Sequence, residues 1–150
     1  MDVESDMLQK CRGMSPNFYS NTQIHEIEKK FDLITMWNVI EHIHNPKPVL
    51  RSMFDLLTDD GEIFIETPMY GSLAKKLGED WSHYIITEHI NLFSRASIKK
   101  VFDELGMKCI SESSFGANIF GEIQPNVKKA LDQMAKEKDF GSTQVLRFKK

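Results

Sequence analysis

The chain has 150 residues, of which 41% are hydrophobic and 27% charged, a composition typical of a globular domain and not of a disordered or fibrous protein. Its formal net charge of -3 offers no basic surface for a phosphate backbone, so we expect no nucleic-acid partner. The only cysteines, Cys11 and Cys109, lack C-x-x-C spacing, and the chain shows no signal-peptide pattern and no membrane-spanning apolar stretch. We therefore expect one cytoplasmic domain over residues 1–150 with no membrane association and unreactive thiols.

The first half of the chain contains one distinct strand. Residues 5–13 have the apolar spacing and flanking residues of a short helix, and 17–20 could form a strand. Phe31 to Trp37 is a compact, largely apolar run without lysine or glycine, which predicts a strand buried on both faces of a parallel sheet.

A helix and a second strand should follow. Apolar residues repeat at helical spacing between Pro46 and Leu57, and Asp59-Asp60-Gly61 predicts a turn after them. Gly61 then opens a strand over 62–66, which Thr67-Pro68 should stop.

The second half of the chain contains clear helix signals. Ser94 is a suitable N-cap for a helix whose apolar residues recur at helical spacing to Leu105, and Gly106 stands where a left-handed C-cap is favoured. A strand is expected over 107–113, an amphipathic helix from Pro125, and a half-exposed strand over 143–148. Alternating strands and helices favour an α/β fold with a doubly wound sheet.

Several spaced motifs resemble those of class I S-adenosylmethionine-dependent methyltransferases of the ubiquinone-biosynthesis type. The family's strand motif F-D-x-I/V is matched by Phe31-Asp-Leu-Ile, and its L-E-H by Ile40-Glu41-His42. Its N/D-P is matched by Asn45-Pro46, and the end of its next helix, L-L-x-x-G-G, by Leu56-Leu57 and Asp60-Gly61. Downstream, Glu66-Thr67-Pro68 and Glu88-His89-Ile90-Asn91-Leu92-Phe93-Ser94 are similar to its T-P-N and E-H-x-x-x-F-S. The resemblance implies a Rossmann-like doubly wound sheet with an antiparallel carboxy-terminal strand.

At the amino end, residues 1–8 resemble the family's G-x-D-x-S-x-x-M-L, which makes Asp2 the expected acceptor of hydrogen bonds from the cofactor ribose. The same acid could be an ordinary terminal residue. The family's first strand and glycine-rich loop normally precede this aspartate, and no G-x-G-x-G occurs elsewhere in the chain. The resemblance therefore implies an amino-terminally truncated domain that lacks both.

The family also implies where S-adenosylmethionine would bind. Met36, Trp37 and Asn38 stand at the carboxyl end of the first clear strand, where open α/β sheets place their ligands. Trp37 could equally be a core aromatic residue. Thr22 and Gln23 fall where the family usually carries an acid that contacts the adenine, and neither of them is acidic.

Two histidines and a cover segment are the expected substrate side. His42 and His89 are candidate general bases, although a histidine at a helix start is often satisfied locally. The family's cover over the substrate corresponds to residues 70–93, in which Tyr70, Trp81 and Glu88 could line a substrate pocket or simply pack under a long connection. The only close histidine pair is His42-x-His44, so we expect no metal site.

The leading hypothesis is methyl transfer from S-adenosylmethionine to a small-molecule acceptor, with the possibility that the truncated chain is inactive. The alternative is a noncatalytic interaction module that retains the second half of the fold. Loss of the first strand would leave the strand at 31–37 with an unpaired edge, so we also expect a homo-oligomer formed through that edge.

Overall fold

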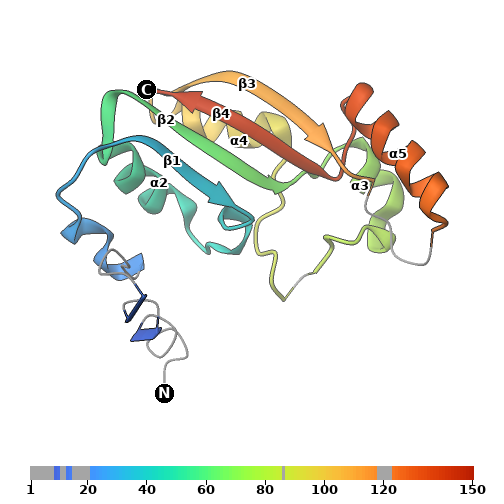
Figure 1. Cartoon of the computed structure of the whole chain (residues 1–150), viewed down its shortest axis with the longest axis horizontal. Coiled ribbons are helices and arrows are strands. Elements are labelled where there is room, and N and C mark those ends of the chain that lie inside the picture. The colour runs from blue at the N-terminus through green and yellow to red at the C-terminus, as the bar shows by residue number, and fades with distance from the viewer. Residues whose placement is uncertain (1–8, 11–12, 15–20, 86, 118–122) are drawn as a thin grey trace. The chain divides into compact units, whose positions relative to one another are not determined.

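The computed structural model describes residues 9–10, 13–14, 21–85, 87–117 and 123–150. These residues belong to two compact units, Met1–Lys30 and Phe31–Lys150, each of which is considered by itself (Figure 1). The first unit contains a short 3-10 helix, η1, at Asn21–Glu26. Asp2 and the strand expected over 17–20 lie outside the described residues, as does most of the helix expected over 5–13.

A four-stranded mixed sheet forms the second unit. Its strands are β1 (Phe31–Trp37), β2 (Leu57–Pro68), β3 (Lys108–Phe115) and β4 (Thr143–Lys149). They lie in the order β1-β2-β4-β3, with β1 parallel to β2 and both other pairings antiparallel (Figure 1). This is the expected α/β architecture, with the expected antiparallel strand near the carboxyl end.

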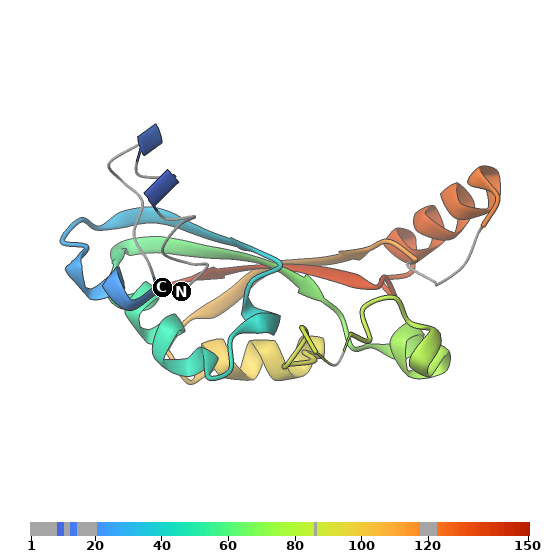
Figure 2. The same ribbon diagram turned by 90° about the horizontal axis from the view of Figure 1, so that it is seen from below.

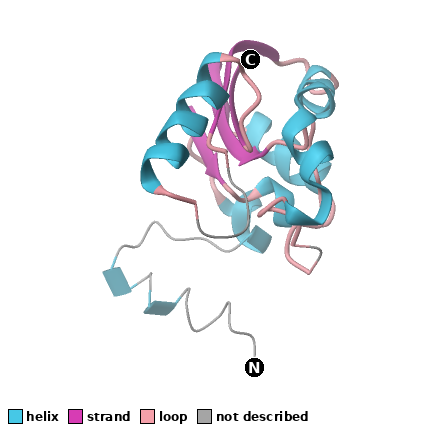
Figure 3. Cartoon of the chain, turned by 90° about the vertical axis from the view of Figure 1, so that its right-hand side faces the viewer, coloured by secondary structure: helices cyan, strands magenta, loops and turns pink. Residues whose placement is uncertain are grey.

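Four helices accompany the sheet: α2 (Pro46–Asp55), α3 (Ser72–Leu77), α4 (Arg95–Asp103) and α5 (Pro125–Glu137). Helices α2 and α4 lie together on one side of the sheet, whereas α5 lies on the other side next to the end of β3 (Figure 2). The end view shows helices on both sides of the strand layer (Figure 3). Within the described residues, no helix is long and apolar enough to cross a lipid bilayer.

The main core lies between the sheet and helices α2 and α4. Ile63 of β2 pairs with Phe148 of β4 on this face of the sheet. These two residues and Phe102 of α4 are fully buried. The Phe102 and Phe148 rings stack with centroids 3.8 Å apart and planes 9° from parallel. Because aromatic side chains bury the largest apolar areas, this stack is a major part of the adhesion between helix and sheet.

The opposite face of the sheet is mixed and largely open at β1. Leu33 and Trp37 are each 54% exposed, so β1 is not buried on both faces as its apolar sequence predicted. The prediction was wrong because β1 is the edge strand of a sheet that α2 and α4 cover on one side only. Its side chains therefore alternate between a buried residue, Met36, and exposed neighbours.

The turn expected at Asp59-Asp60-Gly61 is instead part of β2, which begins at Leu57. The register shifts here, since Phe31 pairs with Leu57 but Leu33 already pairs with Glu62. A Cβ on Gly61 would lie 2.9 Å from the Leu57 Cβ, so the chain folds closely on itself at this irregularity. Asp59, Asp60 and Gly61 therefore form an irregularity inside β2, where the register with β1 shifts, and not a turn before the strand.

The bounds of the other predicted elements after residue 40 are confirmed to within a few residues, but β4 is a central strand with mostly buried side chains, so the prediction that it is half exposed was wrong. Ser94 caps α4 by accepting a hydrogen bond on its hydroxyl from the Ser97 backbone N–H, at 3.1 Å. Gly106, past the end of α4, has φ +86°, the left-handed conformation expected there.

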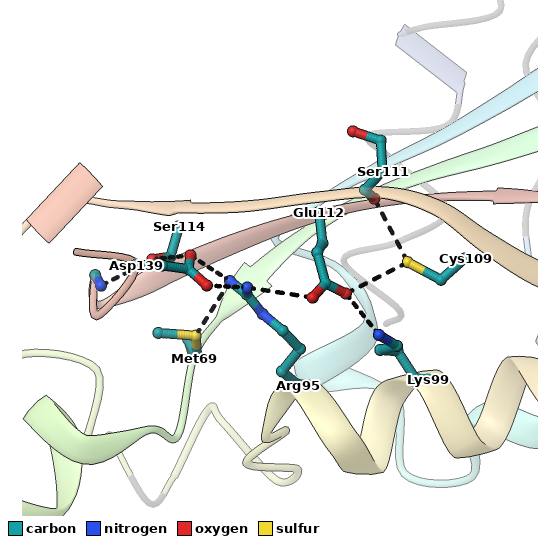
Figure 4. A network of polar contacts seen from close by, with 9 residues as sticks. Met69, Arg95, Lys99, Cys109, Ser111, Glu112, Ser114 and Asp139 are labelled. Atoms are coloured by element: carbon teal, nitrogen blue, oxygen red, sulfur yellow. Dashed lines mark hydrogen bonds and ion pairs between the residues drawn. The ribbon is translucent and has the colours of Figure 1, made fainter. Parts of the chain in front are cut away.

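A network of polar contacts joins the start of α4 to β3 and to the turn after α5 (Figure 4). The Arg95 guanidinium donates to both carboxylate oxygens of Asp139, and its Nη1 also lies 3.6 Å from a Glu112 oxygen. Lys99 donates to Glu112 at 2.8 Å, and the Ser114 hydroxyl donates to Asp139 at 2.8 Å. The hydrogen bond from Arg95 holds the pKa of Asp139 below its usual value.

Cys109 also touches this network. Burial, followed by the hydrogen bond to Glu112, raises the pKa of the Cys109 thiol. A thiol with a raised pKa carries less thiolate at neutral pH than a free cysteine does.

Candidate functional site

The carboxyl end of β1 turns sharply where it leaves the sheet. Asn38 has φ +49°, a left-handed conformation that asparagine adopts more readily than most residues. Its backbone N–H donates to the Glu66 carbonyl, and its side-chain amide donates to the Glu66 carboxylate, both at 2.9 Å. Trp37 packs against Phe64 of β2 with ring centroids 5.0 Å apart. The turn thus presents an exposed indole and a fixed amide at one end of the sheet.

Directly after this turn, the 3-10 helix η2 (Ile40–His42) carries a buried acid. Glu41 is only 1% exposed, and one of its carboxylate oxygens, Oε2, accepts a hydrogen bond from the Thr67 hydroxyl at 3.0 Å. The other oxygen, Oε1, is buried and has no hydrogen-bond partner among the described residues; it lies 3.9 Å from His42 Nε2. Burying a carboxylate is costly unless it is paired, so this oxygen marks a site that calls for a compensating group.

His42 and His89 come from distant parts of the chain and meet with ring centroids 5.0 Å apart. His42 Nδ1 lies 2.8 Å from the Glu88 carbonyl oxygen, and His89 Nδ1 lies 2.7 Å from the His83 carbonyl oxygen. Because a carbonyl oxygen only accepts, each Nδ1 carries the proton and donates it. In the neutral ring, Nε2 is then the atom with a free lone pair.

The connection between β2 and α4 is fastened to η2 by backbone and side-chain contacts of Asn91. The Asn91 N–H donates to the Glu41 carbonyl at 3.0 Å, and its side-chain amide donates to the Ile43 carbonyl at 2.6 Å. These bonds bring His89, two residues earlier, to the end of β1.

A third histidine lies behind this pair. The His83 and His89 rings are 6.0 Å apart, and His83 also packs edge-on against Trp81. Burial, with a smaller contribution from His89, lowers the pKa of His83. Burial therefore favours the neutral form of the His83 ring.

A hollow of about 330 Å³ opens beside His89. Apart from the imidazole, its lining is mainly apolar: Tyr84, Ile85, Ile90 and Leu92. A second hollow of about 410 Å³ lies between α2 and α4, and its lining includes Lys47 and Glu104 but none of the candidate cofactor, substrate or catalytic residues. The first hollow is the one that adjoins the candidate site.

The structure brings together His42, His89 and, through its backbone carbonyl, Glu88. Tyr70 lies 6.0 Å from Trp81, whose ring is fully buried and therefore supports the cover from within. Met36 is 5% exposed, so it belongs to the core.

Thr22 and Gln23 lie in η1 of the first unit, and their side chains are outside the described set. Sequence reasoning did not select Glu41 or Asn91 as site residues. Both stand inside the motifs that carried the family resemblance, Ile40-Glu41-His42 and Glu88 to Ser94, so the signal was present but only the histidines were taken from it.

A family model described as a methyltransferase domain matches residues 6–112. The chain belongs to this methyltransferase family. The family is of the class I type and uses S-adenosylmethionine. The four-stranded mixed sheet described above matches the Rossmann-like fold of solved methyltransferases.

Individual relatives agree with this assignment. A ubiquinone biosynthesis O-methyltransferase from Glaesserella parasuis serovar 5 (strain SH0165) is 46% identical over 39 residues, which are 26% of this chain and 16% of that protein. The matched segment thus spans about a sixth of the curated relative's length.

Solved structures show the same fold at low sequence identity. A SAM-dependent methyltransferase from Archaeoglobus fulgidus has a TM-score of 0.61 at 18% identity, over 99% of this chain and 74% of that one. An S-adenosylmethionine-dependent methyltransferase from Mesorhizobium loti also has a TM-score of 0.61, at 14% identity over 99% and 78%.

Proposed function

We propose that this methyltransferase domain takes part in methyl transfer from S-adenosylmethionine to a small-molecule acceptor that enters the hollow beside His89. The observation that carries the proposal is that the exposed carboxyl end of β1, the His42–His89 pair and this hollow occur at one place in the fold. In open α/β sheets the carboxyl ends of the strands are where ligands bind. The mainly apolar lining favours an acceptor with an apolar body.

Residues at the turn after β1 fit one side of the cofactor. Trp37 offers a half-exposed indole, which attracts a cation such as a sulfonium, and Asn38 holds a fixed backbone turn beside it. Met36 would contribute backbone groups. The resemblance of the sequence to the family, and nothing in the structure, is the reason to keep Asp2, Thr22 and Gln23 as proposed contacts to the adenosine part. When bound, S-adenosylmethionine supplies an electrophilic methyl group.

On the acceptor side, the protein's task is chiefly to position the acceptor and to exclude water. His42 and His89 each hold a free Nε2 lone pair, which suits either as the base that takes a proton from a hydroxyl or amine. Tyr70, Trp81 and the Glu88 segment would form the cover over the bound acceptor.

Calorimetric titration with S-adenosylmethionine tests the proposal, with Trp37→Ala as the variant and Leu33→Ala as its matched control. Both side chains are 54% exposed on the same strand, but only Trp37 stands at the carboxyl end. We expect micromolar affinity in the unmodified chain, a loss of about 5- to 30-fold in Trp37→Ala if the indole contributes the roughly 1–2 kcal/mol of a cation–π contact, and no change in Leu33→Ala. Equal losses in both variants, or no binding at millimolar concentration, would contradict it.

The alternative is a noncatalytic interaction module, and the observation that favours it is the edge position of β1. Edge strands readily pair with another chain, and a second copy is the proposed partner. Sedimentation velocity at micromolar concentration should then show a dimer or larger species. A strict monomer that binds S-adenosylmethionine would leave only the first function.

A further inference from the structure

One carboxylate oxygen and two imidazole nitrogens converge at the carboxyl end of β1. Glu41, His42 and His89 each offer one atom able to bind a metal ion, and these atoms lie within 4.8 Å of one another. His42 and His89 are 47 positions apart in the sequence, so the adjacent His42-x-His44 pair gave no indication of this group. His44 does not belong to it.

The two histidines are held in the way that metal-binding histidines usually are. In such sites the ring nitrogen that does not bind the ion donates its proton to a carbonyl or carboxylate, which fixes the tautomer and the ring orientation. Both rings show this arrangement, through the Glu88 and His83 carbonyls at 2.8 and 2.7 Å. Each therefore keeps Nε2 unprotonated for a ligand.

Glu41 supplies the second, independent sign of a missing cation. Its Oε2 is oriented by the Thr67 hydroxyl, while Oε1 is buried without a hydrogen-bond partner in the described part of the chain. An unpaired buried carboxylate oxygen is costly, and a divalent cation beside it would remove that cost.

The spacing suits a small divalent ion after a modest adjustment. Metal–ligand distances of about 2.0–2.2 Å place the ligands of a tetrahedral ion roughly 3.4 Å apart. His42 Nε2 and Glu41 Oε1 are 3.9 Å apart, and all three ligand atoms lie within 4.8 Å of one another, so the side chains must move closer together to bind one ion. Two imidazoles and one carboxylate are a ligand set that zinc accepts.

We propose that Glu41, His42 and His89 form a binding site for a divalent transition-metal ion of the zinc type. The protein supplies three ligands and leaves a position open, since the His42 side chain is 41% exposed to solvent. Sites with three protein ligands and an open position bind water or a substrate oxygen as the fourth ligand. This proposal replaces the expectation that the chain has no metal site, and it stands whether or not the chain transfers methyl groups.

The experiment is calorimetric titration of the chelator-treated chain with Zn²⁺, followed by the variants Glu41→Gln, His42→Ala and His89→Ala. We expect one ion per chain and a loss of affinity of more than about 10-fold in each variant. Loss of a residue that only orients a metal ligand already lowers affinity about 10- to 100-fold, and these three residues are the ligands themselves. His44→Ala is the matched control, because His44 is an exposed histidine of the same segment outside the group. The proposal fails if Zn²⁺ does not bind, or if His44→Ala loses as much affinity as the three variants.

A second measurement covers variants that do not fold, as judged by circular dichroism. In the unmodified chain labelled with ¹⁵N-histidine, one equivalent of Zn²⁺ should shift the Nε2 resonances of His42 and His89 and leave those of His25 and His44 in place. Shifts at His25 or His44 alone, or none, would overturn the proposal. Titration with S-adenosylmethionine in the absence of metal separates this outcome from failure of the proposed methyl transfer.

Discussion

The two faces of the sheet differ in composition and in how far helices cover them. The face under α2 and α4 is continuous and apolar, with Ile63, Ile65, Leu146 and Phe148 fully buried against helix residues. The opposite face mixes apolar residues such as Leu33 and Phe64 with the ion pair of Glu62 and Arg147. Yet both faces share the same strands and the same hydrogen-bonded register.

This contrast indicates where stability and where binding reside. Burial of apolar surface gives most of the folding free energy, so the helix-covered face should dominate stability. Exposed ion pairs contribute little, so the open face can vary at low cost. The candidate site lies at the carboxyl end of β1, where the buried core ends and solvent begins.

The largest expected effect is a loss on the covered face. Phe102→Ala removes one ring of the Phe102–Phe148 stack and leaves a cavity, and it should lower the free energy of unfolding by about 3–5 kcal/mol. Leu33→Ala on the open face should change it by less than about 0.5 kcal/mol. Urea unfolding of both variants measures the difference, and comparable losses would show that the open face is covered in solution.

Arg95 tests the polar rim of the covered face. Arg95→Met removes the bonds to Asp139 and Glu112 and should destabilise the protein at pH 7 by about 1–2 kcal/mol, the lower range for hydrogen bonds to charged groups because Asp139 is partly exposed. Lys99→Met, which loses only the Glu112 bond, is the control and should cost less.

The same variant predicts a pH dependence. The pKa values of Asp139 and Glu112 are lowered in the folded protein, so their contribution is fully present above the ordinary values of 3.8 and 4.5 and is lost as the pH falls through the lowered ones. Thermal melting from pH 7 to 2.5 should therefore show the Arg95→Met difference shrinking only in acid. A difference that grows on acidification would contradict the assigned pairing.

Ser94 tests how α4 is held over the covered face. Ser94→Ala leaves the Ser97 N–H without its capping acceptor and should lower the free energy of unfolding by about 1 kcal/mol. Ser94→Asp restores an acceptor at the same position and should recover most of that loss. If aspartate is as destabilising as alanine, the hydroxyl stabilises the structure in another way.

The smallest effect is expected on the open face. Arg147→Ala removes the hydrogen bond that chiefly lowers the pKa of Glu62, so that pKa should rise toward its ordinary value, while the melting temperature hardly changes. A carboxyl-carbon NMR titration of Glu62 follows the shift. A large fall in melting temperature would mean that this face is more than a solvated surface.

Much of the fold could be predicted from local patterns. Each of these patterns predicts the structure of the residues next to it. Examples are the helical spacing after Pro46, the Ser94 cap, Gly106 and the alternation at 143–148. Local patterns alone do not show the position of β1 at the sheet edge, because strand order depends on residues far along the chain; the unpaired edge was expected only from the family resemblance and the missing first strand. An apolar strand that is central in one sheet is half exposed in another.

The candidate site shows the same division. Its members stand in recognisable motifs, and His42 and His89 were both expected there. Their meeting depends on Asn91, which ties two segments together, and the significance of Glu41 depends on a hydrogen bond from Thr67. Neither the Thr67 contact nor the unpaired oxygen it leaves is visible in a sequence, because both depend on how the segments pack.

The placement of β4 between β2 and β3 has a consequence for how the protein is made. On the ribosome, β1, α2 and β2 can associate early, but β3 has no strand to join until residues 143–149 emerge. Until then the β1–β2 pair and the single strand β3 expose the backbone edges that β4 will pair with, a period in which nascent chains are prone to aggregate. A chain interrupted before residue 143 would therefore lack the strand that joins β3 to the sheet.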